Sequence, residues 1–226
     1  MSNQVFQQNL DDKNESRQGS PFFIQLLFKE PVDMPGKDKM LSVMQKHIGA
    51  VECYSHSKDT AGFAVQEHIA ESKDGKMPVF LMVIGCDKFN GEGIDDFIMS
   101  QMWDCRAERE RIFSECRYQV MANDMMALTL SAQERANLEA DFVEALAELY
   151  PSCEAFYFEN CGKLLLAEDV RSHQLEGSAR FIHFGVNVRF FNIEGTEDML
   201  VDTVGMSTLF LPDLQYHFHG MDPIGW

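Results

Sequence analysis

The order strand, helix, strand occurs twice in this chain, and this repetition restricts its fold more than any other feature. In each copy a strand-like apolar run precedes a helix with apolar residues at three- and four-residue steps, and a second short strand-like run follows. The pattern predicts an α+β fold: a mixed or mainly antiparallel sheet with helices packed on one face. Two βαβ-like halves related by duplication, or a coincidence of ordinary element lengths, both explain the repetition. The two predicted units are 22–30, 37–48 and 50–55, and 117–123, 131–149 and 155–158.

The helix predicted over 131–149 has the clearest signals. Ser131 and Glu134 have the spacing of a capping box, in which each residue's side chain bonds the other's backbone N–H group. Apolar residues follow on one face and acidic residues on the other, and Pro151 comes after the helix. Other patterns predict an Asp-Gly hairpin between strands 62–70 and 78–85, helices over 107–115 and 164–175, a long strand over 180–193, and shorter strands within 201–208 and 214–219.

Residues 1–20 are rich in Gln, Asn, Asp and Ser, which predicts a flexible leader. The remaining residues, 21–226, are expected to form a single α+β domain, and two subdomains split near 88–104 are the alternative. The amino terminus is polar and lacks an apolar h-region, so no secretory signal is expected, and no run approaches the roughly 20 apolar residues of a membrane span. We therefore expect a cytoplasmic protein with no membrane association.

The charge is strongly negative, since 36 acidic and 19 basic side chains give a net charge of −17. This charge repels nucleic acid and anionic lipid, so nucleic-acid binding is not expected. After Arg189 the chain has no further Lys or Arg. This acidic stretch is either a solubilising surface or a patch that attracts a basic protein partner. The candidate partner-binding residues are Glu194, Glu197, Asp198, Asp202, Asp213 and Asp222.

His217 and His219 are two positions apart, so on a strand they share a face with Gln215. Two imidazoles at this spacing can bind a metal, with an oxygen from Asp202 or Asp213. The simpler interpretation is a pair of hydrogen-bonded structural histidines. Six cysteines are scattered without a CxxC pair, so no metal centre and no cofactor is predicted.

Several residues near turns are interpreted structurally. Gly205 is expected to supply a positive φ angle or a close approach of two backbones, and Pro212 to fix a bend. Asp213 is expected to cap a following segment. Trp103 is predicted to be an anchor in the core or at an interface.

Residues 199–206 and 210–218, followed by Asp222-Pro223, resemble the pattern DT-x-G-[LM] … LPDLQ-x-HF … DP of the bacterial domain-of-unknown-function family 4261. The stretch 100–104 is also similar to that family, which has no established activity or catalytic residues. Phe210 departs from the pattern, because a small residue, often Gly, is expected there. The resemblance implies a bacterial protein of the cell interior. The candidate motif that it marks comprises Trp103, Asp202, Gly205, Pro212, Asp213 and His217.

The sequence lacks the GxxxxGK[ST], GxGxxG, GxSxG and HExxH patterns. We therefore favour a protein that acts by protein–protein binding and not as an enzyme, for example an immunity or antitoxin-like inhibitor of a basic toxin or secreted effector. The alternative is a small metal-dependent hydrolase that uses the carboxy-terminal cluster of Asp202, Asp213, His217 and His219.

Overall fold

The computed structural model describes residues 21–72 and 75–220, so the predicted leader and Asp222 lie outside the described residues. Its elements, in chain order, are β1 (Phe23–Phe28), α1 (Lys37–Ile48), β2 (Val51–His56), β3 (Thr60–Ser72), β4 (Gly75–Lys88), α2 (Asp96–Ser100), η2 (Trp103–Cys105), α3 (Arg109–Glu115), β5 (Tyr118–Met125), η3 (Ala127–Thr129), α4 (Ala132–Leu149), β6 (Ala155–Phe158), β7 (Lys163–Leu166), α5 (Ala167–Ser172), α6 (Ala179–Gly185), β8 (Asn187–Asn192), β9 (Asp198–Val204), η4 (Met206–Leu209) and β10 (Gln215–His219).

Seven strands form the main sheet in the order β2-β3-β4-β5-β1-β6-β7. Every neighbouring pair is antiparallel. Together with the helices, this sheet confirms the predicted α+β fold class. Strands β4 and β5, which flank the segment 89–117, pair with each other, so the sheet continues across that segment.

Both predicted strand–helix–strand units are present in the main sheet. Strands β5 and β6 each pair antiparallel with β1, so they are parallel to each other with one strand between them. Strands β1 and β2 are also parallel, with three strands between them. The two units thus share their direction and differ in how far the chain crosses the sheet.

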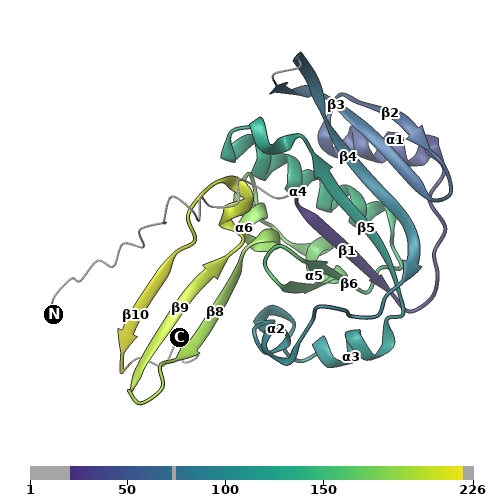
Figure 1. The fold of residues 1–226 in the computed structure, drawn as a ribbon. Helices are drawn as coiled ribbons and strands as arrows, with labels where there is room; N and C mark the ends of the chain where they lie inside the picture. Colours follow the sequence, from purple (N-terminus) through teal and green to yellow (C-terminus); the bar gives the residue numbers. More distant parts are fainter. Residues whose placement is uncertain (1–20, 73–74, 221–226) are drawn as a thin grey trace.

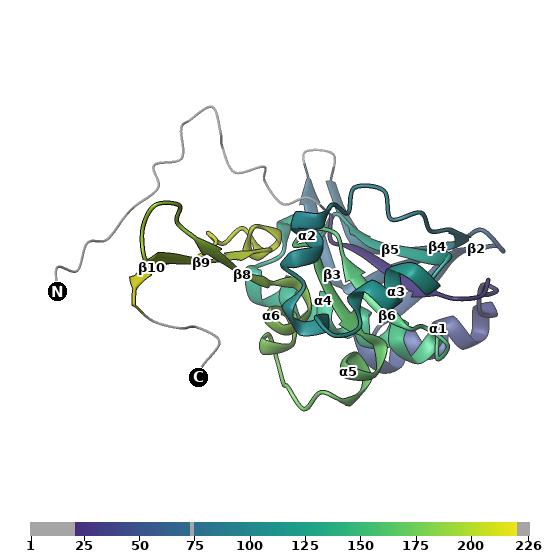
Figure 2. The same ribbon diagram turned by 90° about the horizontal axis from the view of Figure 1, so that it is seen from below.

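The long helices α1 and α4 lie side by side on one face of the sheet, as Figures 1 and 2 show. Their buried residues join the inward side chains of the strands, such as Leu26 and Phe156, in the main core. The opposite face of β1, β6 and β7 is covered by η2 and α3, where Leu27, Tyr157 and Ile112 share a smaller apolar cluster. Adjacent residues of one strand enter different cores because strand side chains alternate between faces.

Local signals located the main helices well. Helix α1 spans the predicted residues, and the capping box of Ser131 and Glu134 is present at the start of α4. Helix α3, strand β6 and the hairpin of β3 and β4 also occur where they were predicted.

The strand predicted over 201–208 ends early, since β9 stops at Val204 and η4 follows it. Two other predicted elements were also wrong in part. Residues 164–175 were predicted to be one helix, but β7 occupies the start of this range and α5 begins only at Ala167. Residues 180–193 were predicted to be one long strand, but α6 ends at Gly185 and β8 follows. In both cases consecutive apolar residues fit a buried helix as well as a buried strand, and tertiary packing decided between them.

The strands β8, β9 and β10 form a second, antiparallel sheet in the order β10-β9-β8, which we call the small sheet. It projects from one side of the body, with β10 farthest out, as both views show (Figure 1, Figure 2). Among the described residues, no helix has the length and apolar character needed to cross a membrane.

Candidate functional site

The small sheet is attached to the body along its β8 edge. The side chain of Gln101, which follows α2, accepts a hydrogen bond from the Phe190 N–H group at 3.1 Å and donates one to the Phe190 carbonyl at 3.4 Å. Phe97 stacks on Phe191 on one side of β8, with ring centroids 6.0 Å apart. On the other side Trp103 meets Phe190 edge-on at 5.4 Å. Trp103 therefore has the anchoring role predicted for it, together with a glutamine that the sequence did not single out.

The register of the small sheet assigns its side chains to two faces. Pairs such as Phe190 with Val201 and Tyr216 with Val201 place these residues on one face. We call this the apolar face. Its apolar members are Val188, Phe190, Met199, Val201, Tyr216 and Phe218, and the polar residues Asn192 and Thr203 lie on the same face.

The apolar face is covered by Trp103 at Phe190 and is partly open to solvent elsewhere. Tyr216 is 66% exposed and Val188 is 42% exposed, and the other four apolar members are half-buried. The rings of Tyr216 and Phe218 stack on each other at 5.9 Å. Contiguous exposed apolar side chains of this kind mark interaction sites on soluble proteins.

The opposite face is mixed: it carries most of the charged groups together with Phe191 and Leu200. Arg189 and Asp202 are cross-strand partners, and the guanidinium group holds both carboxylate oxygens, at 2.8 and 2.5 Å. The hydrogen bond with Asp202 raises the pKa of Arg189. Asp202 is therefore paired within the fold, although the sequence made it a candidate for partner binding.

The two histidines share this face with Gln215, as predicted, and both contact Asp198. The His219 ring nitrogen Nδ1 lies 2.6 Å from the Asp198 carboxylate, and His217 Nε2 lies 3.2 Å from it. The hydrogen bond with His219 is the main reason that the pKa of Asp198 is lowered. Glu197, in contrast, is almost fully exposed, and Glu194 is also exposed in the turn between β8 and β9.

Asp213 organises the turn before β10. Its carboxylate accepts hydrogen bonds from the Met206 N–H group at 3.0 Å and the Thr203 hydroxyl at 3.3 Å. Burial raises the pKa of Asp213, and these two hydrogen bonds oppose that effect. Pro212 precedes it in the exposed turn. Asp213 was predicted to cap a following segment, and this was wrong: it bonds the first residue of η4, which comes before it in the chain.

Gly205 has both properties predicted from the sequence. Its φ angle is +124°, and a Cβ atom built on it would lie 2.0 Å from the Gly185 carbonyl oxygen. The end of β9 thus passes directly against the end of α6. This contact fixes the small sheet on the body.

Phe210 occupies a left-handed backbone conformation, with φ +58°. Its ring lies 6.0 Å from the Arg135 guanidinium group. A left-handed position favours Gly, and Gly is the residue that the resemblance led us to expect here. The tight turn is kept despite the phenylalanine.

The turn at Phe210 allows a test with two substitutions. Phe210→Gly is expected to be more stable than Phe210→Ala by about 1 kcal/mol, because both remove the ring and only glycine removes the left-handed strain. Urea unfolding of the two variants measures this difference. Equal stability, or a more stable alanine variant, would contradict the strain argument.

Arg135 links the carboxy-terminal segment to the core. It is fully buried on α4, and its guanidinium group lies 2.9 Å from Asp124 and also donates to the Thr208 carbonyl. Asp124 in turn accepts a hydrogen bond from the Phe22 N–H group. Glu139 is fully buried 3.8 Å from Arg135. Burial raises the pKa of Glu139 well above its usual value, the negative charge of Asp124 adds to this, and Arg135 opposes it.

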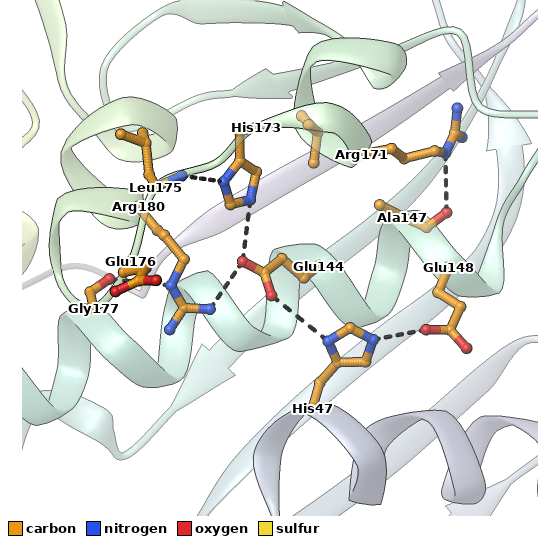
Figure 3. A pocket seen from close by; sticks show the side chains of 11 residues that line it. His47, Glu144, Ala147, Glu148, Arg171, His173, Leu175, Glu176, Gly177 and Arg180 are labelled. Atoms are coloured by element: carbon orange, nitrogen blue, oxygen red, sulfur yellow. Dashed lines mark hydrogen bonds and ion pairs between the residues drawn. The ribbon is translucent and has the colours of Figure 1, made fainter.

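A pocket of about 650 Å³ lies between α1, α4 and the segment 170–180 (Figure 3). Glu144 stands at its centre, with His173 Nε2 at 3.1 Å and Arg180 Nη1 at 2.8 Å. His47 lies 2.8 Å from Glu148. These side chains pair with one another.

Arg171, at the rim of this pocket, has a structural role at the end of α4. Its guanidinium group donates hydrogen bonds to the carbonyls of Ala147, Tyr150, Pro151 and Cys153, at 3.1 to 3.4 Å. These carbonyls include ones that a helix end leaves without helical partners. Helix capping and ion pairing therefore account for the charged side chains that line the pocket, and we do not assign it a ligand.

Arg171→Met is expected to lower the free energy of unfolding by about 2 kcal/mol, since it leaves several carbonyls at a helix end without a charged donor. Arg106→Met is the control. The Arg106 guanidinium group lies over the Trp103 ring at 5.4 Å, so its loss is expected to lower the free energy of unfolding by less than about 1 kcal/mol. Thermal and urea unfolding of both variants provide the comparison. A loss no larger than that of the control would show that the capping contacts contribute little.

Asp202, Asp213, His217 and His219 do not gather around one point. Asp202 binds Arg189, Asp213 binds the turn, and the histidines bind Asp198. Within residues 21–72 and 75–220, no group of three or more His, Cys, Asp or Glu side chains is arranged to hold a metal ion.

The fold and this surface define the class of protein: an α+β protein with a seven-stranded antiparallel sheet and a projecting three-stranded sheet that exposes an apolar face. Comparison with known proteins found no matching family model, no matching curated protein and no matching solved structure. The resemblance to family 4261 therefore stays a prediction.

Proposed function

We propose that this protein acts by binding another protein through the small sheet. The observation that carries the proposal is the apolar face: a sheet that projects from the body and leaves Tyr216 and Val188 exposed. A three-stranded sheet gains stability when its apolar face is covered, so a partner that covers this face gains binding energy there.

Charge complementarity supports a basic partner. After Arg189, whose charge Asp202 balances, the chain carries only acidic charges apart from histidine. The exposed carboxylates Glu194 and Glu197 stand at the tip of the small sheet. A negative tip on a protein of net charge −17 steers a basic partner and raises its association rate. An immunity or antitoxin-like protein that blocks a basic toxin is the specific form of this function that we propose.

The test compares two variants in which a similarly exposed apolar residue is replaced by lysine, one on the small sheet and one on the main sheet. Val188→Lys places a charge on the apolar face, and Ile69→Lys places one on β3, where the side chain is 43% exposed against 42% for Val188. The full-length wild type and both variants are used to capture proteins from the native host at low salt, and recovery is quantified by mass spectrometry.

We expect one basic protein to be recovered in stoichiometric amounts with the wild type and Ile69→Lys, and to be lost with Val188→Lys. The purified partner should then lose its activity when the wild type is added. The absence of a stoichiometric partner, or equal capture by both variants, would contradict binding through the small sheet.

A further inference from the structure

The two edges of the small sheet are treated differently by the fold. The β8 edge is closed at Phe190, because the Gln101 side chain bonds both the N–H and the carbonyl group of that residue. The β10 edge has no such neighbour among the described residues. Proteins usually protect an open strand edge with Lys, Pro or a covering segment, because it can pair with another strand. Residues 215–219, which read QYHFH, contain neither Lys nor Pro.

The hydrogen bonds of β9 show which backbone groups of β10 point outward. The Thr203 N–H group donates to the Leu214 carbonyl at 2.9 Å, so Leu214 points its backbone toward β9. In an antiparallel ladder this direction alternates along the strand. Tyr216 and Phe218 therefore also face β9, and the backbone groups of the alternate residues, Gln215, His217 and His219, face away from the sheet.

The same alternation explains which backbone groups of β9 bond β8. The Ile193 N–H group donates to the Asp198 carbonyl at 3.0 Å, which places Asp198, Leu200 and Asp202 in hydrogen-bonded pairs with β8. The register is thus consistent across all three strands. The outward groups of β10 form no hydrogen bond with the described part of the chain.

We infer that the β10 edge takes up an extended, basic segment of a partner protein as a fourth strand of the small sheet. The inference rests on the proposed function, because the added strand would extend the apolar face that the partner covers. Its backbone would bond the outward groups of Gln215, His217 and His219, which is the mode of recognition called β-augmentation. Its side chains would alternate, with apolar ones beside Tyr216 and Phe218.

The charge of the added strand follows from its surroundings. Asp198 begins the neighbouring strand β9, Glu197 precedes it in the turn at the tip, and Asp213 lies just before the other end of β10. A second copy of this chain would bring the same carboxylates and a net charge of −17 to the edge. A segment with Lys or Arg fits better, so we commit to a basic partner strand and not to a homodimer.

The experiment selects peptides from a random library displayed on phage, using the immobilised full-length protein. Selected peptides are then measured by fluorescence anisotropy against the wild type, His217→Pro and His217→Thr. Proline at 217 removes an outward N–H group and leaves the bonds with β9 in place. Threonine removes the same imidazole but keeps the N–H group, so it is the matched control.

We expect the selected peptides to be positively charged and to alternate apolar with polar residues. They should bind the wild type and His217→Thr equally, and His217→Pro at least tenfold more weakly. If His217→Pro does not fold, peptides that are N-methylated at alternate residues give the same test, since they lose the donors that would bond β10. These peptides should lose binding.

The inference would be overturned if no peptide were enriched, or if the enriched peptides were acidic or did not alternate. It would also be overturned if binding survived both His217→Pro and N-methylation of the peptide, or if the protein formed dimers that His217→Pro abolishes. Peptides that survive the edge tests but are lost with Val188→Lys would leave the proposed function in place. In that case the partner covers the apolar face without adding a strand.

Discussion

Gly205→Ala is expected to lower the free energy of unfolding by about 3 kcal/mol or more, because two separate costs fall on one residue. The φ angle of +124° is one that L side chains rarely adopt. The new Cβ atom would also lie 2.0 Å from the Gly185 carbonyl oxygen and 3.1 Å from the Cys161 Cβ atom. The nearest atom belongs to the backbone, so no rotamer change relieves the contact. Urea unfolding followed by circular dichroism measures the loss.

Gly195→Ala is the matched control for this substitution. Gly195 lies in the turn between β8 and β9 with φ +78°, and a Cβ atom there meets nothing within 4 Å. Its variant carries the backbone cost alone, about 1–2 kcal/mol. If the two variants lose equal stability, the close approach of Gly205 to Gly185 does not hold the small sheet in place.

The role of Gly205 shows how far sequence reasoning extends at a turn. A glycine between apolar residues predicts a positive φ angle or a close backbone approach, and both are present. The partner of that approach could not be predicted. Gly185 was assigned to the interior of a long strand, because the run around it alternates plausibly, whereas Phe181 and Phe184 are buried together on a helix.

The helices with polar ends and one apolar face were predicted best. Ser131 and Glu134 fix the start of α4 through contacts within four residues, so the local sequence contains the whole signal. Strand β7 was missed because its identity depends on pairing with β6, which precedes it across a turn. Local patterns cannot rank a buried strand against a buried helix when all the residues are apolar.

The sequence analysis directed attention to the small sheet but named its carboxylates, not the residues of the apolar face. The carboxylates were expected to be available to a partner, yet Asp202 pairs with Arg189 and Asp198 with the two histidines. These pairings follow from the register, which sequence spacing alone does not give. The alternation of Tyr216 and Phe218 with histidines did indicate a two-faced strand. It could not show that the apolar face would be left partly uncovered.

Arg135→Met is the second substitution with a large expected effect, a loss of about 3–5 kcal/mol in the free energy of unfolding. It leaves the Asp124 carboxylate buried without its cation and removes the donor to the Thr208 carbonyl. Breaking one member of a buried ion pair costs more than the pair contributes, since the remaining charge is stranded away from water. Urea unfolding at pH 7 gives the loss, and a change below about 1 kcal/mol would show that the cluster tolerates a missing charge.

Glu139→Gln tests the same cluster, and its effect on stability should depend on pH. The pKa of Glu139 is raised in the folded state, so the folded protein holds a proton that the unfolded chain releases above about pH 4.3. The contribution of Glu139 to the free energy of unfolding of the wild type is fully present below that pH and is lost as the pH rises toward the pKa of Glu139 in the folded protein. Glutamine does not titrate. The stability of Glu139→Gln relative to wild type should therefore rise with pH, by up to about 1.4 kcal/mol per pH unit. Urea unfolding of both proteins between pH 5 and pH 8 measures this slope, and a constant difference across that range would mean that Glu139 is ionised in the fold.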